Sequence, residues 1–233
     1  MTSAGRTLRS MFQRMAAHYG PTHWWPGDTP FEVAIGAILT QNTAWTNVEK
    51  AIANLKAARL LAPRALCGAP LETIEEALRP SGYFRQKALR VRLFAQHLLD
   101  RYDGSMARLA RRPSGALREE LLALHGIGPE TADDILLYTC GRPVFVVDAY
   151  TRRILGRHGV APHNIGYEPL RALFEQNLEP DTALFKEFHG LIVWTGKDFC
   201  RSRPSCEGCP LAPLLKPGQP LLPPESGTKE KMP

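Results

Sequence analysis

The sequence has no long apolar run anywhere in its 233 residues. A membrane-spanning helix needs about 20 consecutive, mostly apolar residues, so we expect no membrane segment. The first residues, MTSAGRTLRSMFQRM, carry arginines but no continuous apolar stretch. The sequence therefore predicts no signal peptide and a cytoplasmic location.

Cysteines are few, with five in the chain. A disulfide framework is not expected in a reducing compartment. Three of the five fall within ten residues, at Cys200, Cys206 and Cys209. Thiols this close, interleaved with proline and glycine, are typical of a metal site.

Strand patterns are also nearly absent, whereas apolar residues recur at helical spacing along most of the chain. Thr29-Pro30-Phe31-Glu32 has the capping-box pattern of a helix start. Residues 144–147 are apolar but short enough to be an extended connection. We predict an all-α fold, with a mobile tail over residues 216–233, where proline, glycine and charge dominate.

The most informative stretch is a pair of helical segments joined by a glycine turn, LLALHGIGPETADDILLY. Gly126 and Gly128 can adopt positive φ, and Pro129 suits the first turn of the second helix. The exposed amides of such a turn can bind a phosphate. We therefore assign DNA binding to Gly126, Ile127, Gly128 and Thr131, although an ordinary helical hairpin can share this pattern. The net charge of +6 agrees with a polyanionic partner without establishing one.

This hairpin, followed by Val144 to Val147, Asp148 and Thr151-Arg152-Arg153, resembles the helix-hairpin-helix (HhH-GPD) DNA glycosylases of the endonuclease III type. The resemblance implies two domains. Residues 29–142 would form a helical barrel with the hairpin at about 115–140, and residues 1–28 with 143–215 would form a second helical domain. It also implies a monomer that acts in base excision repair on double-stranded DNA containing damaged bases.

Asp148 stands where this superfamily places its essential carboxylate. Such a group can stabilise an oxocarbenium-like sugar and activate water. Asp148 can equally serve as a helix N-cap. Glu130 occupies the position at which members that cut the strand carry a lysine, and a carboxylate forms no imine. The resemblance therefore implies a monofunctional glycosylase, with strand-cutting activity absent or weak.

Aromatic residues flank the capped helix at Trp24-Trp25-Pro26 and at Trp45, and we assign them to the substrate pocket. Together with LTQNT and RPSGY, these segments resemble the 3-methyladenine glycosylases of the superfamily. Cation–π attraction would favour such alkylated purines. The tryptophans can also be plain core residues. By the same resemblance, Asn42, together with Gln41, would fill the gap left by the flipped base; the alternative is a helix-capping amide.

The cysteine segment resembles the loop that holds a [4Fe–4S] cluster in endonuclease III relatives. Cys200, Cys206 and Cys209 match three ligands, but the fourth position is Leu215. A cluster with another fourth ligand is our expectation; zinc or a lost site are the alternatives.

From the sequence we therefore expect a glycosylase for alkylated purines. The alternative functions are a glycosylase for oxidised pyrimidines, uracil or mismatched bases, and a DNA-damage binder without catalysis.

Overall fold

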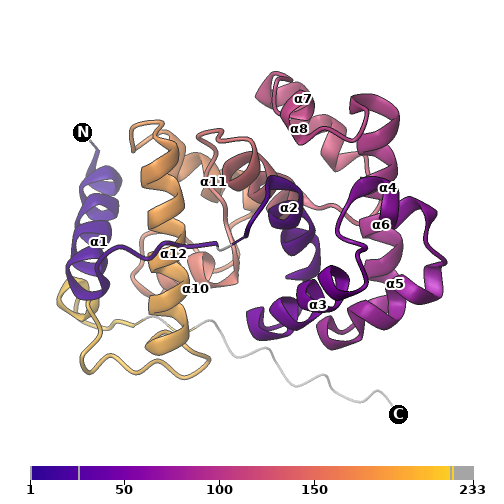
Figure 1. Ribbon diagram of the computed structural model, residues 1–233. Helices are drawn as coiled ribbons and strands as arrows, with labels where there is room; N and C mark the ends of the chain where they lie inside the picture. The colour runs from indigo at the N-terminus through magenta and orange to yellow at the C-terminus, as the bar shows by residue number, and fades with distance from the viewer. Residues whose placement is uncertain (1, 26, 221, 223–233) are drawn as a thin grey trace, which may run out of the picture. The chain divides into compact units, whose positions relative to one another are not determined.

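The protein was analysed as a computed structural model, which describes residues 2–25, 27–220 and 222. All its regular elements in these ranges are helices, as expected (Figure 1). Among the described residues, no helix is both long and apolar enough to cross a bilayer. Residues 141–148 form an extended connection without strand pairing.

The chain divides into two compact units. Unit 1 comprises residues 1–22, 147–179 and 187–233, and unit 2 comprises residues 23–146 and 180–186. Unit 2 thus contains the segment 29–142 that we assigned to the barrel. It also takes in residues 23–28, 143–146 and 180–186, which we had placed in the other domain. Packing explains this difference, because Trp25 stacks on Tyr138 at 4.7 Å and Phe145 lies edge-on against Phe185 at 5.4 Å between ring centroids.

Unit 2 is built from short helices packed around one long helix, α6 (Phe84–Tyr102). The other elements that precede the hairpin are α2 (Pro30–Leu39), α3 (Trp45–Ala57), α4 (Pro63–Gly68), α5 (Leu71–Leu78), η1 (Arg79–Ser81) and α7 (Met106–Leu109). Helix α2 starts as the capping box predicts, since the Glu32 amide donates to Thr29 Oγ1 at 3.1 Å. Fully buried residues of α2, α3 and α6, such as Ile38, Leu55 and Phe94, form the centre of its core.

The predicted hairpin consists of α8 (Ser114–Leu122), α9 (Pro129–Asp134) and a π-helical continuation, η2 (Ile135–Thr139). A bidentate ion pair joins the two helices, with Arg118 Nε and Nη2 at 2.7 and 3.1 Å from the carboxylate of the fully buried Asp133. Charge-assisted pairs of this geometry are strong and directional. The ion pair therefore fixes the angle at which the glycine turn leaves α8.

Unit 1 contains α1 (Ser3–Tyr19), α10 (Ala149–Arg157), α11 (Tyr167–Glu175), η3 (Ala212–Leu214) and the larger part of α12 (Thr182–Asp198). Helix α10 approaches α12 closely at Gly196, where a Cβ atom would lie 2.2 Å from the Tyr150 ring. Most of the expected tail lies outside the described residues. Its start is ordered against α10, because Gln219 Nε2 donates to the His158 carbonyl at 2.9 Å.

Candidate functional site

Trp25 and Trp45 meet in unit 2 with their ring centroids 5.4 Å apart and line one pocket of about 240 Å³. Trp45 begins α3, and Trp25 precedes α2. Both rings approach Gly36 of α2, whose missing side chain leaves them room: a Cβ there would lie 3.6 Å from each. Tyr138 stacks on Trp25, with 4.7 Å between the ring centroids. Aromatic residues distant in sequence thus form one cluster beside a cavity.

The pocket lining also carries more carboxylates than cations. Lys56 Nζ forms ion pairs with the carboxylates of both Asp28 and Glu32, each at 2.7 Å, so one positive charge is shared between two negative charges. Glu49 accepts a hydrogen bond from Trp45 Nε1 at 2.9 Å, which fixes the orientation of that ring. Since the remaining charge is negative, the pocket favours a cationic or electron-poor planar ligand.

The indole N–H of Trp25 is buried and has no hydrogen-bond partner among the described residues. A buried donor left unpaired costs about 1–3 kcal/mol, and an acceptor on a ligand would recover part of this. Trp24 packs edge-on against Trp25 at 6.4 Å but does not contribute to the described pocket lining. Pro26, the remaining residue assigned to the pocket, lies outside the described residues.

In the glycine turn, only one of the two glycines needs positive φ. Gly126 has φ +85°, whereas Gly128 is extended at φ −93° and serves as the N-cap of α9. A Cβ at Gly126 would collide with the Arg90 side chain, but at Gly128 nothing lies within 4 Å. The backbone at Gly128 is therefore open to an approaching phosphate. Ile127 and Thr131 are buried and support the turn from inside.

Gln41 and Asn42 are neighbours in the turn after α2, but the Gln41 side chain is hydrogen-bonded within the protein, whereas the Asn42 side chain is exposed. Gln41 Nε2 donates to the Gly126 carbonyl at 3.0 Å and to Thr131 Oγ1 at 2.9 Å, and Arg90 donates to Gln41 Oε1. The Gln41 amide is thus occupied within the protein and ties this turn to the hairpin. Asn42 is exposed at φ +53°, where its amide can reach a ligand.

Two further residues of unit 2, to which we assigned no role from the sequence, contribute to this region, and one of them, Tyr83, ends the RPSGY segment. Tyr83 is 64% exposed in a left-handed conformation at φ +47°. An exposed ring held this way offers a face on which a base can stack. Lys87 is fully buried, although it lies in the polar stretch FRQKALR, where a lysine is expected to be exposed.

In unit 1, Asp148 is the N-cap of α10, as its alternative interpretation predicted. Its Oδ1 accepts from the Thr151 amide and hydroxyl, each at 2.7 Å, and its Oδ2 lies 3.9 Å from His189 Nε2. Burial lowers the pKa of His189, although the nearby Asp148 raises it. The imidazole is therefore neutral at pH 7 and supplies no positive charge to the carboxylate. Capping orients the carboxylate without neutralising it.

The three clustered cysteines also belong to unit 1, where they line one small cavity. Two arginines of α10 hold the loop that carries them. Arg157 donates to Cys200 Sγ at 3.2 Å and to the carbonyls of Arg201 and Ser202 at 2.6 Å, and Arg153 Nε donates to the Cys200 carbonyl. Guanidinium groups thus brace this segment.

The cysteine loop does not present a full ligand set for a [4Fe–4S] cluster. Three thiols share a cavity, but position 215 is leucine, and within the described ranges no three His, Cys, Asp or Glu side chains are grouped as they would be around a metal ion. Such a cluster takes four protein ligands. The cysteines present supply three of these four ligands, so the loop does not hold a complete cluster site by itself.

Comparison with known proteins adds independent evidence. Residues 35–180 match the family described as HhH-GPD superfamily base excision DNA repair protein. A protein of Methanocaldococcus jannaschii named as a DNA repair glycosylase is 41% identical over 206 residues, covering 88% of this chain and 93% of the relative. Endonuclease III of Thermotoga maritima is 33% identical over 181 residues, covering 77% and 79%.

Solved structures agree at the level of the fold. The H. pylori 3-methyladenine DNA glycosylase bound to 1,N6-ethenoadenine is 29% identical, with a TM-score of 0.71 over 84% of this chain and 98% of that one. A trapped covalent complex of endonuclease III with DNA is 24% identical, with a TM-score of 0.77 over 92% and 96%.

Proposed function

Because the chain belongs to the HhH-GPD superfamily of base excision DNA repair proteins, we propose that it is a monofunctional DNA glycosylase that removes alkylated purines such as 3-methyladenine. The observation that carries this proposal is the pocket lined by Trp25 and Trp45 with its excess of carboxylates. A purine alkylated at a ring nitrogen is planar and cationic. Aromatic faces and negative charge together favour it over neutral bases. The H. pylori relative, solved with an adenine derivative, supports this choice.

For the chemistry, we assign Asp148 as the carboxylate that stabilises the oxocarbenium-like sugar and deprotonates the attacking water. Oδ1 is held by Thr151, so the orientation of the group is fixed before substrate binds. The cationic base is a good leaving group and needs no separate acid to protonate it. One carboxylate is therefore enough for the reaction.

For DNA binding, we assign the open backbone at Gly128 to a phosphate and Asn42 to the gap left by the extruded base. A base must leave the duplex before an enzyme of this kind can act on it. The exposed ring of Tyr83 can stack on a neighbouring base. Gln41, which is bonded to the hairpin, positions Asn42 and does not itself contact DNA in this proposal.

A [4Fe–4S] cluster at Cys200, Cys206 and Cys209 stays a prediction that requires a fourth ligand from elsewhere. Iron and zinc analysis of protein purified without oxygen tests it. Oxidised pyrimidines and mismatched thymine are the second candidate substrates, after alkylated purines. They are supported by the similarity to relatives named endonuclease III and thymine-DNA glycosylase.

Excision from a panel of duplexes distinguishes these substrates. The panel carries 3-methyladenine, 1,N6-ethenoadenine, uracil, thymine opposite guanine, or an oxidised pyrimidine. We expect the alkylated adenines to be released fastest. Trp45→Ala should slow their release by about ten- to thirtyfold, equivalent to roughly 1.4–2 kcal/mol of stacking and cation–π energy. Faster release of uracil or thymine by the parent protein would contradict the assigned substrate class.

Two controls make the panel conclusive. Thermal melting identifies a packing defect, since truncating a core tryptophan costs on the order of 3–5 kcal/mol of stability. Asp148→Asn keeps an N-cap oxygen for Thr151 and should remain folded. Its single-turnover excision should fall by about a hundredfold or more, while binding to abasic DNA is retained. If Asp148→Asn binds damaged DNA normally and the parent releases no base from any duplex, the protein is a binder without catalysis.

A further inference from the structure

Helix α6 of unit 2 carries a row of polar side chains along one side of the helix. Lys87, Arg90, His97 and Arg101 are spaced by three, seven and four residues, which places them on the same side of a helix. Each makes a polar contact with another element. Most other buried residues of α6 are apolar and belong to the core, so this row of polar contacts is unusual for a central helix.

The row begins with Lys87, whose ammonium reaches two turns at once. Lys87 Nζ donates to the Leu39 carbonyl at 2.9 Å and to the Ser81 carbonyl at 2.6 Å. Leu39 ends α2, immediately before the turn that carries Asn42, and Ser81 ends η1, two residues before the exposed Tyr83. One buried side chain thus anchors both turns.

Arg90 extends the same row to the hairpin. It donates to Gln41 Oε1, and the Gln41 amide in turn binds the Gly126 carbonyl and Thr131. The Arg90 side chain also fills the space beside Gly126, where a Cβ would lie 2.3 Å from its Nε. The position of the glycine turn is therefore coupled to the turn at Asn42 through one guanidinium and one amide.

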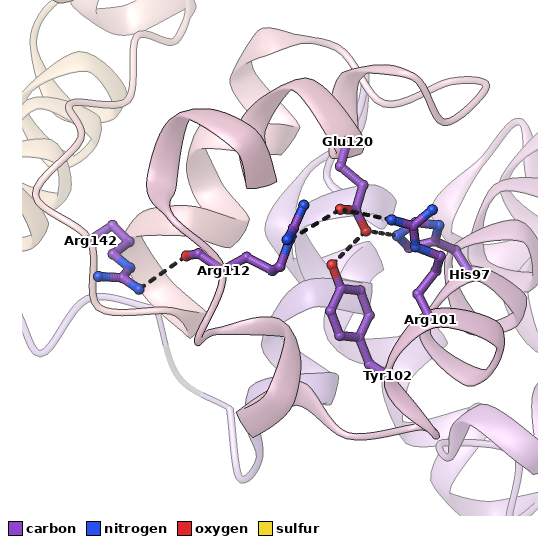
Figure 2. A network of polar contacts seen from close by, with 6 residues as sticks. All are labelled: His97, Arg101, Tyr102, Arg112, Glu120 and Arg142. Atoms are coloured by element: carbon purple, nitrogen blue, oxygen red, sulfur yellow. Dashed lines mark hydrogen bonds and ion pairs between the residues drawn. The ribbon is translucent and has the colours of Figure 1, made fainter.

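Towards its C-terminal end, the row holds the first hairpin helix. Figure 2 shows Glu120 of α8 between His97, Tyr102, Arg101 and Arg112. Its carboxylate lies 2.7 Å from His97 Nε2 and accepts from the Tyr102 hydroxyl at 2.6 Å. Helix α8 is thereby fixed to the C-terminal part of α6 through Glu120, which lies in the last turn of α8.

We propose that Lys87 and Arg90 are positioning residues, which hold the turn at Asn42, the turn at Tyr83 and the glycine turn as one preformed surface for extruding a base. A surface assembled before binding does not incur the cost of ordering three loops on the DNA. The proposal rests on the DNA glycosylase activity and not on the preference for alkylated purines.

The test compares Arg90→Met with Arg90→Lys and with Arg64→Met. Arg64 is a matched control for charge, because its side chain is 80% exposed and pairs only with Asp103 among the described residues. Binding is followed on a duplex with a tetrahydrofuran abasic analogue opposite 2-aminopurine, whose fluorescence reports unstacking. This probe contains no damaged base, so its outcome is independent of the proposed substrate. Single-turnover excision is then measured on whichever substrate the parent releases.

For Arg90→Met, we expect weaker 2-aminopurine unstacking and excision from duplex reduced by about ten- to a hundredfold, as a small misplacement of catalytic contacts would cause. Excision from single-stranded DNA, which needs no extrusion, should change less than twofold. Arg90→Lys should recover part of the loss, and Arg64→Met should behave as the parent. Parental unstacking by Arg90→Met, or equal losses on duplex and single strand, would overturn the proposal, since equal losses indicate general damage to the fold.

Discussion

At the scale of single residues, Lys87 combines complete burial with a perturbed pKa. Burial, and secondarily the charge of Arg90, lowers the pKa of Lys87 to about 8. An unfolded lysine titrates near 10.4. Between these two values the unfolded chain binds the additional proton, so the free energy of unfolding rises with pH in this window. A neutral amine still has two N–H donors for the carbonyls of Leu39 and Ser81.

The resulting prediction is that, between pH 8 and about 10, the free energy of unfolding changes with pH with a more positive slope in the parent protein than in Lys87→Met. Urea unfolding at pH 7.5, 8.5 and 9.5 measures it for both proteins. Lys87→Met also leaves two carbonyls without a donor and should be less stable at every pH, by about 1–3 kcal/mol. Equal pH slopes for the two proteins would show that Lys87 keeps an ordinary pKa when folded.

Other residues show what the sequence could and could not specify. Thr29 and Asp148 cap their helices as their local patterns predict, because a cap depends only on neighbours three residues away. Lys87, in contrast, bonds the carbonyls of Leu39 and Ser81, and only the tertiary fold brings Leu39 near it. No periodicity along the chain reports such contacts. Gln41 was assigned to DNA from the family resemblance, and its bond to the Gly126 carbonyl of the hairpin could not be predicted from the sequence.

At the scale of elements, the hairpin was predicted with its helices and its turn, since glycine, proline and apolar spacing are local signals. The different roles of its two glycines were not predictable, because they follow from Arg90 on α6. Trp25 and Trp45, which we assigned to one pocket, do line one cavity. Its carboxylates are Asp28 before α2, Glu32 in the first turn of α2 and Glu49 of α3, and no local pattern marks these three as pocket residues. Because Gly126 has a positive φ and Gly128 has open space beside it, substitutions at the two glycines should affect stability and DNA affinity differently.

Gly126→Ala and Gly128→Ala should separate stability from DNA affinity. Alanine at 126 must adopt φ near +85° and displace Arg90, so we expect a loss of about 1–2 kcal/mol of stability together with weaker binding. Alanine at 128 fits its extended backbone and should change stability by less than about 0.5 kcal/mol. Its methyl group would occupy the space where a phosphate approaches, lowering affinity about tenfold.

Thermal melting and titration of an abasic-analogue duplex give the two quantities for each variant. Unchanged affinity of Gly128→Ala would mean that the DNA backbone does not approach this turn. Unchanged stability of Gly126→Ala would show that alanine adopts this positive φ and that Arg90 moves aside, both without cost.

At the scale of the whole molecule, the fold alone leaves the type of reaction undecided. A trapped covalent complex with DNA and a glycosylase bound to an adenine derivative both share this architecture. Strand cleavage in the covalent type requires an amine near the sugar, whereas hydrolysis requires an oriented carboxylate and water. The relevant difference is therefore the chemistry of a few side chains on a common framework.

Glu130, in the first turn of α9, provides a carboxylate where the lysine nucleophile is expected in strand-cutting relatives. Another amine of unit 2 must be considered. Lys186 Nζ lies 3.5 Å from the Tyr138 carbonyl and 5.8 Å from the centre of the Tyr138 ring, which stacks on Trp25. Burial lowers the pKa of Lys186, which increases the fraction of reactive neutral amine. Its engagement with Tyr138 argues that it holds the aromatic cluster and does not attack the sugar.

The last prediction is that the parent protein forms no covalent adduct with abasic DNA. A duplex with an aldehyde abasic site is incubated with protein in two portions. The portion with borohydride should show no trapped species, and the portion without borohydride should remain uncut until alkali is added. Glu130→Lys places an amine at the hairpin position and should gain trapping, which proves that the assay detects an imine. The substrate already lacks its base, so base preference does not affect the result. Trapping by the parent that disappears in Lys186→Met would instead make Lys186 the nucleophile and the protein a bifunctional enzyme.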